Sequence, residues 1–157
     1  MNVNQCLTLM YAYQKENNIA GKSVANVDYL FTLMRHIDPK TKACPKTVIC
    51  CTVNEAKQLR CFVHVIIMLD DNTFIDPSYE VHSVEDKQYY DKIASFVSIN
   101  EKLLKSCDRA FPQALFKQFI EHTKMTEQLA AGNLVPKNKD VEYLTAQSDY
   151  IHANFKP

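Results

Sequence analysis

The chain has 157 residues, with 18 basic and 18 acidic side chains and a formal net charge of zero. A chain of this length is expected to form one domain, residues 1–157, that buries about two-thirds of its unfolded surface. The balanced charge gives no electrostatic reason to expect nucleic acid or an anionic membrane as a partner. The apolar runs are also shorter than the roughly 20 residues that span a bilayer.

The chain has six cysteines but only two glycines, and these counts bear on its redox compartment and on whether it binds a nucleotide cofactor. Residues 1–6 lack the basic start and apolar core of a signal peptide. We therefore expect reduced thiols and a cytoplasmic location. With Gly21 and Gly132 as the only glycines, glycine-rich phosphate-binding loops are absent, and we predict no cofactor.

Apolar residues at helical spacing predict a first helix from about Gln5 to Glu16. Asn4 is a suitable N-cap for this helix, which would place Cys6 in its first turn. The elements predicted next are a helix over about 24–36 that ends at Asp38-Pro39, a polar loop over 40–45 and a β-branched strand over Thr47–Val53.

Residues 62–78 are predicted to form a β-hairpin, because an apolar, β-branched run is followed by a turn signal and a second short run. His64 interrupts the first run and Asp76 interrupts the second. A three-residue loop over 70–72 would place the two side chains diagonally across from each other on one face of the sheet. A two-residue turn at 71–72 would place them on opposite faces, and the sequence does not decide between the turns.

The rest of the chain is predicted to be mostly helical. Residues 83–97 are compatible with a helix or an edge strand, and Ser98–Glu101 has the capping-box pattern that opens a helix ending near Cys107. Two further helices are predicted over about 113–131, with Gly132-Asn133 as the stop, and over 141–155. Helices, then a small antiparallel sheet, then helices define an α+β fold.

His64 and Asp76 carry the functional argument. A buried carboxylate needs a partner, and an imidazole on the neighbouring strand can supply one. Such a pair fixes the tautomer of the imidazole and leaves the other ring nitrogen available as a base. A histidine on an apolar strand is also commonly a satisfied core residue, so the same pair has a purely structural interpretation.

The hairpin resembles a known family. His64 on one strand, and Asp76-Pro77-Ser78 after Phe74-Ile75 on the next, resemble the His strand and the aromatic-x-Asp-Pro-Thr/Ser strand of transglutaminase-like proteins. These belong to the papain-like cysteine peptidase superfamily. The run that starts at His64 also resembles the His-Val-Gly-Ile-Tyr strand of the superfamily's cell-wall amidopeptidases. The resemblance covers about seventeen residues. It implies a Cys-His-Asp triad whose cysteine precedes the histidine and lies at a helix N-terminus.

Cys6 is the cysteine that fits this order best. A helix N-terminus lowers the pKa of a thiol and offers backbone N–H groups to an oxyanion. The predicted catalytic residues are therefore Cys6, His64 and Asp76. The alternative for Cys6 is the role of a small buried hydrophobe.

The other cysteines are weaker candidates. Cys50-Cys51 lies within a predicted strand, where thiols usually pack into the core. Cys44 is expected to be a free thiol on a loop, and Cys107 would require a permuted order of the triad. Cys61 and His64 have a short ligand spacing, but they would point to opposite faces of a regular strand, so we predict no metal site.

Two hypotheses follow. The first is a cysteine-dependent hydrolase or acyltransferase, such as a thiol protease, deamidase or transglutaminase-like enzyme, that acts on a protein or peptide substrate. The second is a non-catalytic relative that serves as a protein-interaction module and retains His64 and Asp76 as a structural pair. The sequence leaves the oligomeric state open.

Overall fold

A computed structural model describes residues 1–19, 21–53, 59–71, 73–78, 113–133 and 138–157. The helices and strands in this part of the chain are α1 (Val3–Glu16), α2 (Ser23–Ile37), β1 (Cys44–Val53), β2 (Leu59–Met68), β3 (Phe74–Ile75), α5 (Gln113–Ala130) and α6 (Asn138–Asn154). The predictions for 83–97 and for the helix ending near Cys107 lie outside the described residues.

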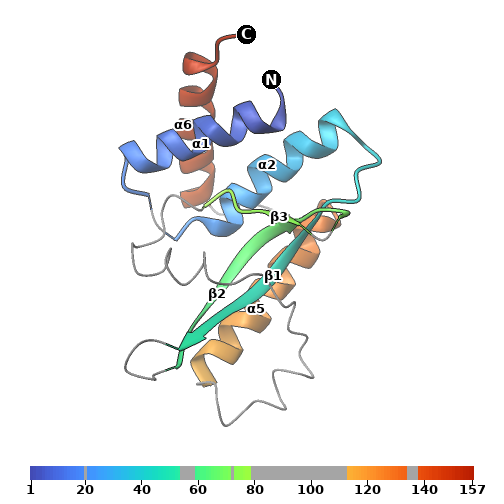
Figure 1. The fold of residues 1–157 in the computed structure, drawn as a ribbon. Coiled ribbons are helices and arrows are strands. Elements are labelled where there is room, and N and C mark those ends of the chain that lie inside the picture. The colour runs from blue at the N-terminus through green and yellow to red at the C-terminus, as the bar shows by residue number, and fades with distance from the viewer. Residues whose placement is uncertain (20, 54–58, 72, 79–112, 134–137) are drawn as a thin grey trace.

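The three strands form one antiparallel sheet in the order β1-β2-β3. In the register of β1 and β2, Val48 lies opposite His64 and Thr47 lies opposite Val65. α5 packs along β1 and β2, while α1, α2 and α6 gather at the other end of the molecule (Figure 1). The prediction of an α+β fold is therefore confirmed.

The first helix begins earlier than predicted. Asn2, not Asn4, is its N-cap, because the Asn2 side chain accepts from the Gln5 N–H at 2.8 Å. The Gln5 side chain in turn accepts from the Asn2 N–H at 2.9 Å, which completes a capping box. Cys6 is consequently the fourth helical residue, and its N–H already donates to the Asn2 carbonyl at 3.1 Å.

Two other boundaries test the predictions directly. β1 begins at Cys44, so the polar loop predicted over 40–45 is shorter and Cys44 is a strand residue. The predicted stop after α5 is confirmed at Gly132, which has a φ of 75°. The Gly132 N–H donates to the Leu129 carbonyl and the Asn133 N–H to the Gln128 carbonyl, so the helix ends in a reversed turn that suits glycine.

The hydrophobic core joins the sheet to the helices. Buried residues from each of the four described helices contribute, among them Met10, Leu30, Leu129 and Ile151, and they pack against Ile67 of β2. Among the described helices, none combines the length and the hydropathy required to cross a membrane.

Candidate functional site

Of the two loop lengths that the sequence allowed, the hairpin has the three-residue loop. The Leu69 N–H donates to the Thr73 carbonyl at 2.8 Å, and Met68 lies opposite Phe74 in the sheet. Asp71 stabilises the loop, because its Oδ1 accepts from the Thr73 N–H at 3.1 Å and from the Thr73 hydroxyl. These bonds lower the pKa of the Asp71 carboxyl, with the hydroxyl contributing most.

This register brings His64 and Asp76 together. His64 Nε2 lies 2.8 Å from Asp76 Oδ2, and the two residues are 5% and 4% exposed. The second carboxylate oxygen, Oδ1, accepts from the Ser78 N–H at 2.8 Å. The carboxylate therefore orients the ring through Nε2, as it would in a catalytic pair whose Nδ1 exchanges a proton with a nucleophile.

α1 is bound to the segment that carries Asp76. The Tyr11 hydroxyl donates to the backbone carbonyl of Asp76. One turn further along, the Gln14 side chain donates from Nε2 to the Pro77 carbonyl at 2.7 Å, and Gln14 is fully buried. The backbone after β3 thus obtains its hydrogen-bond partners from helix side chains rather than from another described strand.

α2 and α6 extend the same polar network. Asn26 Nδ2 donates to Ser78 Oγ at 2.8 Å, and Asn26 Oδ1 accepts from the Tyr143 hydroxyl at 2.6 Å. Tyr143 also contacts Gln147 Oε1 at 3.0 Å, and burial raises the pKa of the Tyr143 phenol. Asp76 is therefore joined through Ser78 and Asn26 to a helix that follows it by more than 60 residues.

Gln14, Asn26 and Gln147 are fully buried, and none of them was predicted from the sequence to belong to the site. The available signal was helical spacing: Gln14 follows the buried Met10 by four residues, and Gln147 follows the buried Tyr143 by four. A polar side chain at a core position of a helix needs an internal partner. That partner was not predictable without the tertiary fold.

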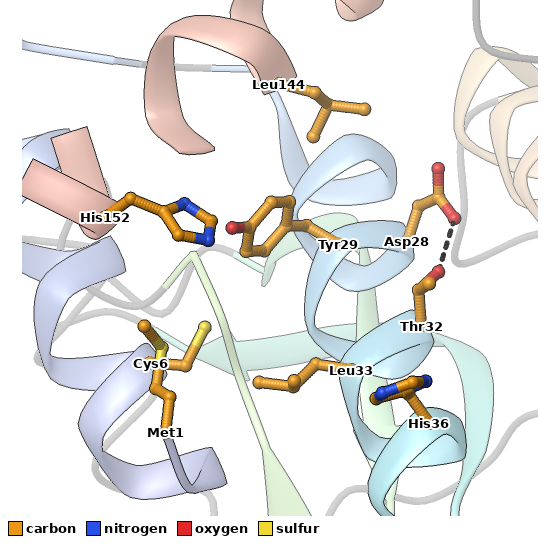
Figure 2. A pocket seen from close by; sticks show the side chains of 9 residues that line it. All are labelled: Met1, Cys6, Asp28, Tyr29, Thr32, Leu33, His36, Leu144 and His152. Carbon is orange, nitrogen blue, oxygen red and sulfur yellow. Dashed lines mark hydrogen bonds between the residues drawn. The ribbon is translucent and has the colours of Figure 1, made fainter. Parts of the chain in front are cut away.

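Cys6 lies in a different environment from the histidine. Its side chain is fully buried in the core cluster with Met10 and Ile151. Burial raises the pKa of its thiol from the ordinary 9.0 to about 11. Cys6 also lines a cavity between α1, α2 and α6, and neither His64 nor Asp76 belongs to that lining (Figure 2).

Of the other cysteines considered as nucleophiles or metal ligands, only Cys44 has a described side chain. Cys44 is half-buried at the start of β1, and its thiol lies 3.4 Å from the Pro45 carbonyl. The side chains of Cys50-Cys51 and Cys61, and the whole of Cys107, are outside the described set. Within the residues that the structure does describe, no three His, Cys, Asp or Glu side chains are grouped to hold a metal ion.

Comparisons of this chain with protein-family models, with curated proteins and with solved structures found no match. The function is therefore inferred from the geometry of the site.

Proposed function

We propose that this chain is a non-catalytic interaction module in which His64 and Asp76 hold the hairpin to the helices. The observation that carries the proposal is that Asp76 forms hydrogen bonds with β2, with its own turn and with α1. Its carboxylate binds the His64 ring at 2.8 Å and the Ser78 N–H at 2.8 Å, and its carbonyl binds Tyr11. These bonds account for the burial of the Asp76 carboxylate by a structural role, with no catalytic role needed to explain it.

The state of Cys6 supports the same proposal. With a thiol pKa of about 11, Cys6 is almost entirely protonated at neutral pH. A catalytic cysteine requires the opposite shift, because the thiolate is the nucleophile. The Cys6 N–H is also engaged inside α1, bonded to the Asn2 carbonyl at 3.1 Å, and so it is not available to an oxyanion.

The helix beside the Asp76 segment supports it further. Asn26, in the first turn of α2, contacts Ser78, so the start of α2 lies next to the turn that holds Asp76. α2 begins at Ser23 and contains no cysteine. A helix N-terminus close to the pair is where the predicted triad needs its thiol, and this helix does not supply one.

One observation favours the cysteine hydrolase or acyltransferase instead. The bond between Nε2 and the carboxylate gives the His64 ring the orientation that a general base requires. This remains the second candidate function, with a protein or peptide as substrate. Under either candidate we keep the proposal of a cytoplasmic location, which the free thiols of Cys6 and Cys44 support.

The two functions separate by active-site labelling of the intact chain. The native protein is treated with iodoacetamide from pH 5 to pH 9, and separately with a fluorophosphonate that detects an activated serine. Each site of labelling is located by mass spectrometry. The interaction module predicts that every labelled cysteine follows the pH dependence of an ordinary thiol and that no serine is labelled.

The control variant is His64→Gln, which keeps a polar side chain at the position and removes the base. The module predicts the same labelling pattern in the variant wherever circular dichroism shows that it is folded. Rapid labelling of one cysteine or serine below pH 7 that disappears in His64→Gln would establish a catalytic nucleophile and overturn the proposal.

A further inference from the structure

The cavity beside Cys6 has the size and composition of a small-ligand site. Its volume is about 430 Å³, and it is formed where α1, α2 and α6 meet. Ligand sites in proteins are commonly 300–1,000 Å³ and mostly apolar, with a few polar groups that fix orientation. By that measure the space accommodates roughly ten to twenty non-hydrogen atoms.

Apolar and sulfur-containing side chains form most of the cavity lining. Tyr29 and Leu33 contribute from α2, Leu144 from α6, and Cys6 and Met1 from the N-terminal end of the chain (Figure 2). The Tyr29 hydroxyl donates to Ser148 Oγ at 3.3 Å, so its proton is already engaged on α6. The apolar lining selects a ligand whose body is hydrocarbon.

Two polar groups of the cavity lining, Asp28 and His152, can accept a hydrogen bond from a ligand, beside Thr32 and His36. Asp28 lies on the side of the Tyr29 ring opposite His152 (Figure 2). Its carboxylate has a weak contact of 3.4 Å from the Thr32 hydroxyl. The ion pairs among the described residues join Lys22 with Asp140 and His64 with Asp76, so Asp28 has no cationic partner there.

His152 adds a second acceptor. Its Nδ1 lies 2.7 Å from the Ser148 carbonyl, and a carbonyl only accepts, so Nδ1 carries a proton. In the neutral ring Nε2 is then unprotonated and accepts a hydrogen bond. Partial burial also raises the pKa of the Asp28 carboxyl, which is the expected effect where a carboxylate has no compensating cation.

We propose that this cavity binds an apolar group that carries a protonated primary amine, with the hydrocarbon against Tyr29, Leu33 and Leu144 and the ammonium at Asp28. This inference deepens the proposed function, on which it rests, by naming the ligand chemistry of the interaction module. An arylalkylamine and the N-terminal residue of a peptide both have this chemistry, and the experiment distinguishes them.

The test is calorimetric titration of the full chain with four probes. These are 4-phenylbutylamine, 4-phenylbutanoate, the peptide Phe-Ala-Ala-amide and the same peptide N-acetylated. We expect saturable binding of at least one amine, at least tenfold tighter than its acid or acetylated counterpart. Binding of 4-phenylbutylamine alone indicates a small-molecule ligand, and binding of the free peptide indicates a protein N-terminus.

Three variants connect the binding to the cavity. Asp28→Asn should remove most of the preference for the amine, whereas Asp149→Asn, which removes the same charge from an exposed position on α6, should leave it unchanged. Leu144→Trp should fill the cavity and abolish binding, with its fold checked by circular dichroism. Val141→Trp, at a 46% exposed position on α6 outside the cavity, is its matched control.

The inference is overturned if neither amine binds at millimolar concentration, if the acid or acetylated probes bind as tightly as the amines, or if Asp28→Asn leaves the preference unchanged. These outcomes do not involve His64 or a nucleophile. They are therefore distinguishable from a failure of the proposed function, which would appear as His64-dependent labelling.

Discussion

Removing the carboxylate of Asp76 should destabilise the domain far more than removing an exposed carboxylate. In Asp76→Ala the Ser78 N–H loses its acceptor at 2.8 Å and His64 Nε2 loses its partner at 2.8 Å. Both groups are buried, and a buried donor without an acceptor costs about 1–3 kcal/mol. The expected loss is therefore about 2–5 kcal/mol, a large part of the stability of a domain this size.

The assay is urea unfolding at 25 °C, followed by circular dichroism. Asp76→Asn keeps one carbonyl oxygen that can accept from Ser78, so its loss should be smaller, about 1–2 kcal/mol. It is also the variant to measure if Asp76→Ala does not fold. Asp149→Ala, at an exposed position, is the control and should stay within about 0.5 kcal/mol of the parent. An Asp76→Ala variant as stable as this control would refute a structural role for the pair.

Three further predictions test other parts of the structure. Burial raises the pKa of the Cys6 thiol from 9.0 to about 11, so the unfolded chain releases this proton at a lower pH than the folded chain. As the pH rises from 8 to 11, the free energy of unfolding of the parent should therefore fall by up to about 2–3 kcal/mol relative to Cys6→Ala, measured by urea unfolding at each pH. Equal pH profiles for the two proteins would contradict the burial of this thiol. Thr47→Val removes the 3.2 Å contact between the hydroxyls of Thr47 and Thr126, but the Thr126 hydroxyl still donates to the Thr123 carbonyl at 2.9 Å. The free energy of unfolding, measured by thermal unfolding, should therefore change by less than about 1 kcal/mol. Gly132→Ala should cost about 1 kcal/mol in the same assay, because an alanine at a φ of 75° is strained; no change would mean that α5 does not end in this conformation in solution.

The local patterns in the sequence predicted the elements of the N-terminal half and of the last two helices well. The hairpin and the approach of His64 to Asp76 depended on a single undecided quantity, the length of the loop. The Asp71 side chain stabilises the three-residue loop, because it accepts hydrogen bonds from the N–H and the hydroxyl of Thr73. No glycine was available to signal the turn type, so the register required the structure.

The nature of the site was less predictable. The position of Cys6 near a helix start suggested an activated thiol, but activation depends on solvent exposure and on the side chain that the thiol faces. Residues of α2 and α6 pack with Cys6 in the core, which no local pattern predicts. Likewise, Asn26 and Gln14 become partners of the Asp76 segment only through contacts across more than 50 residues of chain.

The reactivity of Cys6 in the native chain tests the central claim most directly. The rate of its alkylation by iodoacetamide at pH 7 is measured in the folded protein and again in 8 M urea, with the modified residue identified by mass spectrometry. If Cys6 is a buried core thiol with a pKa of about 11 instead of 9.0, it reacts about 100-fold more slowly in the folded chain than in the unfolded one, because the thiolate is the reacting form. Faster reaction in the folded chain would mean that the fold activates this thiol, and it would contradict the account.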